Sequence, residues 1–194
     1  MVIDYRYVNS VTKDFPYPSP LIEDFLCKES KNRICSIFDL ESGFHQMHLD
    51  PSSRAVIAFM TPWGNYHWKV LPMGIKQAPA LFQRMVNWIL REVPCARAYV
   101  DDILAGTEDV INPVKRHYED VCRVLDALRK YFITIKGPKM HLFRTMIKFC
   151  GHVLFDGKRK AAPSKLEALH TWTSEMIKTV TQMKGFLGLA QYYS

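Results

Sequence analysis

The chain has 194 residues, of which 48% are hydrophobic and 23% charged, with a formal net charge of +7. This length fits one domain with a real core, or one domain plus a small appendage. The basic balance is compatible with nucleic acid as a partner, although a solvated basic surface gives the same sum. The five cysteines are scattered and form no Cys-x-x-Cys pair, which disfavours zinc and a disulfide framework. We therefore expect an intracellular protein, in cytoplasm or nucleus, with no membrane span and no signal peptide.

The first forty residues predict two strands separated by a loop and a helix. Three prolines exclude regular structure from the loop, because proline lacks a backbone N–H and fixes φ. The second strand is rich in apolar and β-branched residues, as a buried strand requires. The predicted segments are a strand at Val2–Tyr5, a loop at Phe15–Pro20, a helix from Leu21 to about Cys27 capped near Ser19 or Pro20, and a buried strand at Arg33–Leu40.

The next sixty residues predict a strand, a hairpin and a helix. After Phe44 the side chains alternate between two faces, which is typical of a strand. Turn-forming residues then separate two further strand-like runs. In the helix, apolar residues recur at spacings of three and four, as on one buried face. The segments are alternation from Phe44 to Leu49, a hairpin of Ala55–Thr61 with Tyr66–Leu71, and a helix through Leu81–Leu90 that ends before Pro94.

The last third predicts a long helix, a strand, a hairpin and two closing helices. Asn112 stands at the N-cap position with Pro113 after it. The expected core stripe of this helix is Val114, His117, Tyr118, Val121, Val124, Leu125 and Leu128, with Lys115, Arg116, Glu119, Asp120 and Arg123 facing outward. The other segments are a strand at Phe132–Ile135, a hairpin of Met146–Phe155 with Lys158–Ala161 across Asp156-Gly157, and helices opened by the capping boxes Ser164/Glu167 and Thr179/Gln182.

Two adjacent carboxylates, Asp101 and Asp102, lie between apolar runs in the segment Ala98–Leu104. A tight hairpin there pushes both into one small volume, where each raises the pKa of the other unless a cation lies between them. Oxygen-only ligands favour magnesium, and Asp39, at the end of its own strand, is the candidate third carboxylate. An Asp-Asp pair is also common as an ordinary solvated turn, so the pair alone is only a hypothesis.

Seven sequence boxes resemble, in the right order, the reverse transcriptases of Ty3/gypsy-like LTR retrotransposons. The Tyr-x-Asp-Asp box alone is moderately specific, whereas seven boxes in order over essentially the whole chain are very specific. The boxes are Val2–Asn9, Tyr17–Pro20, Phe38–Gln46, Leu71–Pro79, Tyr99–Asp102, Phe149–Val153 and Phe186–Tyr193.

The resemblance implies an α+β right-hand polymerase with an antiparallel palm sheet packed on helices. Residues 1–38 and 52–80 would be partial fingers, residues 39–51 and 81–162 the palm, and residues 163–194 the start of the thumb. The implied reaction is nucleotidyl transfer with two magnesium ions, or manganese, held by Asp39, Asp101 and Asp102. The implied partners are an RNA template, a DNA primer and a deoxynucleoside triphosphate (dNTP).

The resemblance also implies residues that bind substrate. Leu40 would add its backbone carbonyl to the metal site, and Phe44 would be the aromatic gate that excludes a ribose 2′-hydroxyl, although an aromatic residue there also fits a simple core role. Met73 and Gly74 would pack on the incoming nucleotide, where many members carry another large residue at the first position. Cys150, Gly151 and His152 would grip the primer backbone, with an ordinary hairpin edge as the alternative.

Family members have more chain before the Val2–Asn9 box and continue beyond the thumb into a connection and an RNase H domain. Two interpretations follow: a segment of a longer polyprotein, or a captured, non-catalytic RNA-binding or structural component of a larger assembly that starts at Met1. A basic interaction domain with no enzymatic history is a third possibility, supported only by the net charge.

Overall fold

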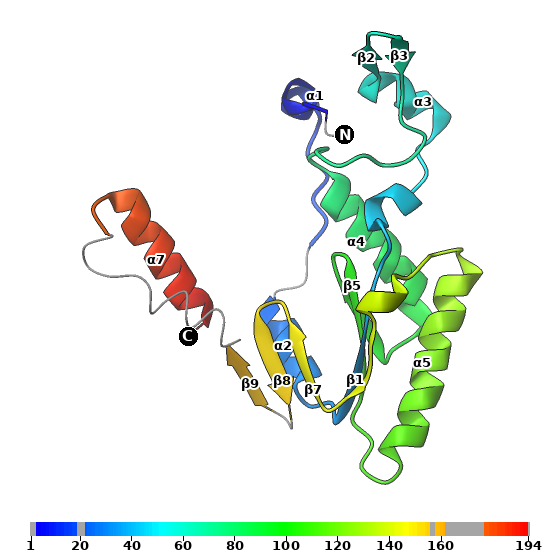
Figure 1. The fold of residues 1–194 in the computed structure, drawn as a ribbon, viewed down its shortest axis with the longest axis vertical. Helices are drawn as coiled ribbons and strands as arrows, with labels where there is room; N and C mark the ends of the chain where they lie inside the picture. Colours follow the sequence, from blue (N-terminus) through cyan, green and yellow to red (C-terminus); the bar gives the residue numbers. More distant parts are fainter. Residues whose placement is uncertain (1–2, 19–21, 156–157, 162–176, 194) are drawn as a thin grey trace.

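The computed structural model describes residues 3–18, 22–155, 158–161 and 177–193 (Figure 1). Its strands form a four-stranded sheet of order β4-β5-β1-β6, a two-stranded sheet β2-β3 and a three-stranded sheet β7-β8-β9. All the strand pairs are antiparallel, so the predicted α+β class with an antiparallel sheet is confirmed. The strands are β1 (Ile34–Asp39), β2 (Phe59–Thr61), β3 (Gly64–Tyr66), β4 (Ala96–Tyr99), β5 (Asp102–Thr107), β6 (His141–Arg144), β7 (Met146–Phe149), β8 (His152–Phe155) and β9 (Lys158–Ala161). The helices are α1 (Arg6–Val11), α2 (Ile22–Glu29), α3 (Pro51–Arg54), α4 (Ala78–Ile89), α5 (Pro113–Lys130) and α7 (Val180–Tyr193), with 3-10 turns η1 (Gly43–Gln46), η2 (Ala55–Ile57), η3 (Leu90–Glu92) and η4 (Gly137–Lys139).

The central sheet is covered on both faces. Side chains alternate along each strand, so β1 and β5 contribute residues to both layers. Figure 1 shows α4 and α5 on one side of β1 and β5, and α2 with β7 and β8 on the other. Phe38 and Ile103 belong to the cluster with the two long helices, whereas Ile37 and Leu104 belong to the cluster with α2 and the β7-β8 hairpin. The central strands are therefore buried on both sides, and the site lies where they end.

The N-terminal predictions are half right. Strands were expected at Val2–Tyr5 and Arg33–Leu40; β1 confirms the second, but Ile3–Tyr5 has no regular structure and α1 follows. Tyr5 is buried because its ring packs inward and its hydroxyl donates to the carbonyl of Ile57 at 3.3 Å, a tertiary contact that local pattern cannot show. The helix expected from Leu21 is confirmed as α2, while its proposed caps lie outside the described residues.

Between Phe44 and Leu71 the sequence predicted more strand than the structure contains. The alternation after Phe44 is wrong: η1 forms there, after Ser42 turns the chain in the left-handed conformation at φ 50°. The hairpin exists as the short pair β2-β3, but Asp50 caps α3 with its side chain, and helical turns replace the start of the expected first strand. The predicted amphipathic helix is confirmed as α4.

The long helix α5 begins at the predicted Pro113, and four residues of its predicted core stripe are buried: His117, Val121, Val124 and Leu128. Val114, Tyr118 and Leu125 are exposed, whereas Asp120, expected to face outward, is buried. Asn112 occupies the N-cap position without a side-chain capping hydrogen bond. The buried Asp120 carboxylate accepts a 2.8 Å hydrogen bond from Thr107 of β5.

The strand expected at Phe132–Ile135 is wrong apart from one bridge between Ile135 and Leu40. Phe132 has φ 57° and is exposed, and the unpredicted strand β6 pairs with β1 instead. The pairing expected after Met146 is confirmed, with an additional turn that divides the first run into β7 and β8.

Two predicted features near the C-terminus, the Asp156-Gly157 turn and the helix opened by Ser164, lie outside the described residues. The second capping box is confirmed at the start of α7. The Gln182 side chain accepts from the Thr179 backbone N–H at 3.0 Å, and the Thr179 hydroxyl accepts from the Gln182 N–H at 3.2 Å.

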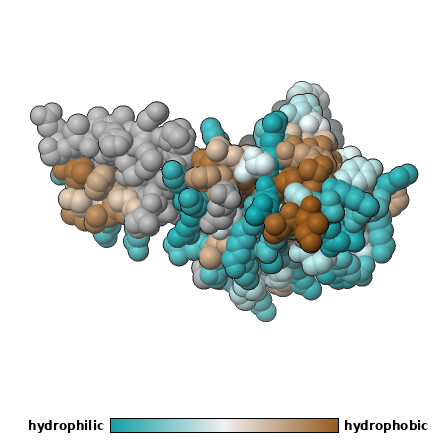
Figure 2. Space-filling model, turned by 90° about the horizontal axis from the view of Figure 1, so that it is seen from below, coloured by the Kyte–Doolittle hydropathy of each residue, from teal (hydrophilic) through white to brown (hydrophobic). Residues whose placement is uncertain are grey.

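Viewed from below, the surface carries a hydrophobic patch among hydrophilic side chains (Figure 2). The exposed apolar residues at the start of α5 include Val110, Ile111, Val114 and Tyr118. Among the described helices, none combines the length and apolar composition that crossing a membrane requires.

Candidate active site

Antiparallel pairing of β1 with β5 brings the three predicted carboxylates to one end of the sheet. Asp39 is the register partner of Asp102, although the two lie far apart in sequence. Asp101 belongs to the two-residue turn between β4 and β5, directly before Asp102. The backbone also ties the turn to β1, since the Leu40 N–H donates to the Asp101 carbonyl at 3.3 Å.

The turn that carries Asp101 is held by a buried glutamine of α4. Val100 adopts φ 52°, a conformation that is strained for a β-branched residue. The Val100 N–H donates to Gln83 Oε1 at 2.7 Å, and Gln83 Nε2 donates to the Ala98 carbonyl at 2.9 Å. Gln83 is almost fully buried, so the core of the domain fixes the shape of the turn.

The three carboxylates repel one another electrostatically. Burial raises the pKa of Asp101, and the charge of Asp39 adds to the rise. Burial also raises the pKa of Asp102, with further contributions from Asp39 and Asp101. The positive charge of Lys139 lowers the pKa of both Asp101 and Asp102 and so opposes these shifts. Its ammonium lies 3.0 Å from Asp39 Oδ2. The site therefore favours a positive charge among these carboxylates.

The segment that carries Lys139 is fastened along the end of β1. The Lys136 N–H donates to the Asp39 carbonyl at 2.8 Å, and the Glu41 N–H donates to the Thr134 carbonyl at 3.2 Å. The 3-10 turn η4 then places Lys139 beside the Asp39 side chain.

The donor chemistry of this trio fits a hard divalent cation, since it offers carboxylate oxygens and already attracts an ammonium group. Within the part of the chain that the structure describes, no three His, Cys, Asp or Glu side chains converge closely enough to form a ready-made metal site. The side chain of Asp39 is instead paired with Lys139.

Two contacts place Phe44 near the carboxylates: its ring packs on Phe82, and the residue before it, Gly43, lies against Asp101. The Phe44 ring packs edge-on against Phe82 of α4, with 5.1 Å between the ring centroids. The preceding residue, Gly43, leaves no room for a side chain: a Cβ there would lie 2.7 Å from Phe82 Cζ and 3.1 Å from Asp101 Oδ1. Phe44 is thus both partly buried against the core and close to the carboxylate end of the sheet.

The turn between β7 and β8 also approaches the carboxylates. Cys150 and Gly151 form it, at φ 47° and 78°. Burial raises the pKa of the Cys150 thiol to about 12, and the nearby charge of Asp102 contributes. Phe149, just before the turn, packs edge-on against Tyr99 with 6.4 Å between centroids. His152 follows in β8 and is buried.

The loop containing Met73 and Gly74 is held from α1. Asn9 donates from Nδ2 to the Gly74 carbonyl at 2.8 Å and accepts from the Lys76 N–H at 2.8 Å. Met73 is exposed. The contacts that fix this loop therefore lead to the N-terminal segment, and no described hydrogen bond joins it to the carboxylates.

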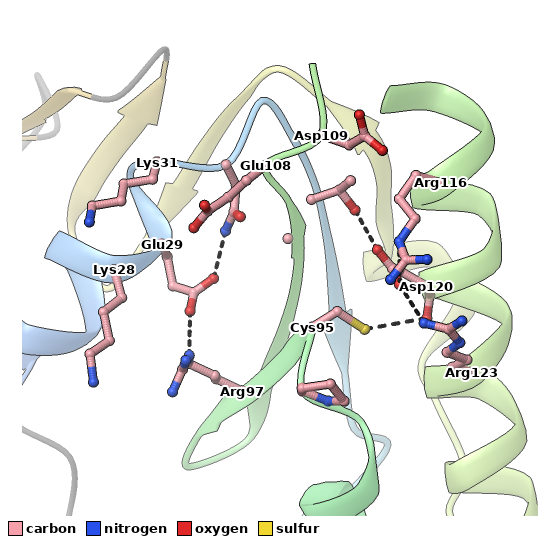
Figure 3. A pocket seen from close by; sticks show the side chains of 14 residues that line it. Lys28, Glu29, Lys31, Cys95, Arg97, Glu108, Asp109, Arg116, Asp120 and Arg123 are labelled. Carbon is pink, nitrogen blue, oxygen red and sulfur yellow. Dashed lines mark hydrogen bonds and ion pairs between the residues drawn. The ribbon is translucent and has the colours of Figure 1, made fainter. Parts of the chain in front are cut away.

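A pocket of about 380 Å³ lies at the opposite end of the β4-β5 hairpin, between α2 and α5 (Figure 3). Glu29 accepts from Arg97 Nε at 2.8 Å, and Asp120 accepts from Arg123 at 3.2 Å. Lys28 and Lys31 add further positive charge at its edge. The pocket contains none of the site residues predicted from the sequence.

Comparison with known proteins decides the family. The family model described as reverse transcriptase (RNA-dependent DNA polymerase) matches residues 1–154. The chain belongs to the reverse transcriptase family. The chain is 36% identical to the retrovirus-related Pol polyprotein from transposon opus of Drosophila melanogaster, covering all of this chain and 19% of that polyprotein. It is 33% identical to the enzymatic polyprotein of cauliflower mosaic virus (strain D/H), covering all of this chain and 28% of that protein.

A solved reverse transcriptase has the same fold. The foamy viral protease-reverse transcriptase in complex with double-stranded DNA superposes with a TM-score of 0.88 at 26% identity, over 99% of this chain and 33% of that one. The predicted polymerase fold and the resemblance to LTR-retrotransposon reverse transcriptases are thus confirmed. The chain spans 19% and 28% of the length of these two polyprotein relatives.

Sequence reasoning assigned no individual role to three residues that hold the candidate site: Gln83, Lys139 and Asn9. Gln83 lies on a helix that was predicted from its apolar face, and its buried amide accepts from the Val100 N–H of the turn. A polar residue inside an apolar stripe is the signal that points to it. Lys139 acts through a contact distant in sequence, for which no local signal exists, whereas Asn9 lies in the first sequence box and contacts the Gly74 loop.

Proposed function

We propose that this chain carries the polymerase active site of an RNA-directed DNA polymerase, which extends a DNA primer along an RNA template with dNTPs. The observation that carries the proposal is the register that sets Asp39 opposite Asp102, next to Asp101 in the adjoining turn. The relatives support it: solved foamy viral protease-reverse transcriptases are described in complex with double-stranded DNA and with RNA/DNA hybrid.

In the proposed mechanism, Asp39 and Asp101 would hold two magnesium ions, or manganese, with Asp102 taking a smaller share. The backbone carbonyl of Leu40 would be a further ligand. The bound ions would make the primer 3′-hydroxyl a better nucleophile and neutralise charge on the reacting phosphate. The chain's own contribution is to fix the carboxylates: β1 and β5 set the position of Asp39 and Asp102, and Gln83 holds the turn of Asp101.

The remaining site residues take substrate-binding roles in this proposal. Phe44, braced against Phe82, would exclude a ribose 2′-hydroxyl and so select deoxyribonucleotides. The Cys150–His152 turn would position the primer end, which its closeness to Asp102 supports. Met73 and Gly74 would contact the incoming nucleotide and template from the loop held by Asn9.

The same proposal assigns the parts of the chain. Residues 1–38 and 52–80 would be partial fingers, residues 39–51 and 81–162 the palm, and residues 163–194 the start of the thumb. The rest of a polyprotein would be its covalent partner, as in the relatives. The five cysteines are scattered and form no Cys-x-x-Cys pair, a usage that fits a reducing intracellular compartment.

The test is primer extension by the full chain on poly(rA)·oligo(dT) with magnesium and dTTP. We expect Asp101→Asn to reduce extension by at least about a hundredfold, because a charge-bearing ligand is lost. The matched control is Asp126→Asn, an exposed carboxylate of α5, which should extend like the parent.

Each other outcome has a definite meaning. Extension by Asp101→Asn within about tenfold of the parent would contradict the two-metal assignment. No extension by the parent, with RNA binding retained, would contradict catalysis by this chain. It would favour a non-catalytic RNA-binding or structural component of a larger assembly.

A further inference from the structure

Lys139 places a positive charge where the proposed reaction needs a metal ion. Its ammonium lies 3.0 Å from Asp39 Oδ2, and this contact is both a hydrogen bond and an ion pair. Asp39 is the β1 member of the carboxylate trio, and its side chain is only 24% exposed. A partly buried carboxylate beside two others is unfavourable unless a cation lies near it.

The backbone of Lys139 is fixed while its side chain is not. The segment is anchored by the hydrogen bond from the Lys136 N–H to the Asp39 carbonyl, and the turn η4 is closed by the bond from the Lys139 N–H to the Lys136 carbonyl at 3.0 Å. The next residue, Met140, packs against the main core cluster. The Lys139 side chain is 57% exposed, so its ammonium can leave Asp39 without any movement of the segment.

We propose that Lys139 is a resident cation of the active site: its ammonium neutralises Asp39 while no metal is bound, and it leaves Asp39 when a divalent ion arrives. This inference rests on the proposed function and deepens it. Lys139 thereby lowers the apparent affinity of the site for the ion. In exchange it stabilises the carboxylate end of the sheet before the ion binds.

The chain contains a matched control three residues away. Lys136 lies on the same segment and pairs with Glu41 at 3.6 Å, with its side chain 40% exposed. Removing either lysine changes the net charge equally. Only Lys139 touches a carboxylate of the trio, so a general charge effect and a specific competition predict different results for the two variants.

The test measures Mn²⁺ binding to the full chain without nucleotide or nucleic acid, from the electron paramagnetic resonance signal of free Mn²⁺. We expect Lys139→Met to bind Mn²⁺ about fivefold more tightly than the parent, the size expected for release of a partly exposed ion pair. Lys139→Arg keeps the charge and should bind within about twofold of the parent, as should Lys136→Met. Parent-like affinity in Lys139→Met, or equal tightening in Lys136→Met, would overturn the inference.

Thermal unfolding gives a second readout. In buffer with a chelator, Lys139→Met should melt below the parent, and added Mn²⁺ should restore the difference because a bound ion stabilises the folded state. A lower melting temperature that Mn²⁺ does not restore would show a merely structural role and overturn the inference.

Asp101→Asn separates this inference from the proposed function. If Asp101→Asn binds Mn²⁺ as tightly as the parent, the proposed metal site fails, and the inference fails with it. If Asp101→Asn loses Mn²⁺ while Lys139→Met matches the parent, the proposed site stands and only the role of Lys139 is refuted.

Discussion

Gln83 Oε1 accepts a 2.7 Å hydrogen bond from the backbone N–H of Val100, so a buried residue of α4 holds the turn that carries Asp101. The same amide donates to Ala98 on the preceding strand. The turn contains a β-branched residue at positive φ, a strain of about 1–3 kcal/mol that persists only when the surroundings enforce it.

We expect Gln83→Leu to lower the free energy of unfolding by about 1–3 kcal/mol, because the buried Ala98 carbonyl and the part-buried Val100 N–H both lose their partner. Primer extension should fall at least about tenfold, because Asp101 is no longer held. Urea unfolding and steady-state extension measure the two effects.

The double variant tests the cause. Glycine adopts positive φ without strain, so Val100→Gly should make the turn less dependent on Gln83. The destabilisation by Gln83→Leu should then be smaller in the Val100→Gly background. Additivity within about 0.5 kcal/mol would contradict a direct coupling between the two residues.

A fully buried histidine of α5 joins three elements of the fold. The Thr107 hydroxyl donates to Asp120 at 2.8 Å, so it can only accept from His117 Nδ1–H, at 2.9 Å. His117 Nε2 is then the acceptor for the Ser36 hydroxyl at 2.7 Å, and Ser36 accepts from the Phe143 N–H at 3.1 Å. Every donor in this hydrogen-bond network has an acceptor only if the His117 imidazole is neutral.

Burial lowers the pKa of His117, an effect that exceeds the opposing influence of Asp120. The unfolded chain then binds more protons below about pH 6.5, so the free energy of unfolding should decrease as the pH falls from about 6.5 through the lowered folded pKa. Urea unfolding between pH 8 and pH 5 measures this slope.

We expect His117→Phe to lose about 2–4 kcal/mol at pH 8, because buried Ser36 and Thr107 lose a partner. It should also lose the His117 share of the pH slope. The exposed His67 provides the control, and His67→Gln should keep the parent's slope. An unchanged slope in His117→Phe would refute the role of the neutral imidazole.

Gly43 places η1 directly against Asp101 of the carboxylate turn. A methyl group there would lie 2.7 Å from Phe82 Cζ and 3.1 Å from Asp101 Oδ1, and both neighbours would have to move. We expect Gly43→Ala to cost about 1–3 kcal/mol of stability and at least about tenfold in primer extension.

The matched control is Gly188→Ala in α7, where nothing lies within 4 Å of the added methyl group. It should leave extension unchanged and stabilise the helix slightly, by up to about 1 kcal/mol. Parent-like extension by Gly43→Ala would show that the approach to Asp101 does not matter for activity.

Phe44→Val tests the proposed sugar gate. The smaller side chain should admit a 2′-hydroxyl, so incorporation of ribonucleotides relative to deoxyribonucleotides should rise by about tenfold or more. Loss of the edge-on contact to Phe82 should lower the free energy of unfolding by about 1 kcal/mol, in addition to the effect of burying less apolar surface. Competitive single-nucleotide incorporation measures the ratio.

The control is Phe59→Val, since Phe59 lies in β2 and stacks on Tyr66 instead. It should leave the ratio unchanged. If Phe44→Val also leaves the ratio unchanged, Phe44 is a core residue only.

The sequence predicts this fold best where the signal is local. The strand before Asp39, the hairpin around Asp101 and the amphipathic α4 each follow from a short pattern, and the structure contains all three. The order of the boxes predicted the family, and that prediction is confirmed. The roles of the individual site residues stay predictions.

The errors come from contacts between distant segments. Apolar spacing on α5 favoured Val114 and Tyr118 as core residues, but both are exposed, and the buried side includes Asp120, which is hydrogen-bonded to Thr107. The run around Phe132 has strand-like composition, yet β6 takes the free edge of β1. In both cases the deciding partner lies outside any local window.

The pairing of Asp39 with Asp102 also limits how this domain can change in length. Neighbouring residues of a strand face opposite sides, so one residue inserted between Ser36 and Phe38 would turn the Asp39 carboxylate to the other face of the sheet. It would simultaneously turn Phe38 out of its core. A substitution in β1 changes one side chain, but an insertion or deletion there reverses the facing of every later side chain in the strand. The exposed connection at residues 108–112 carries no such constraint, so variation in length among relatives is expected there and not in the strands that carry the carboxylates.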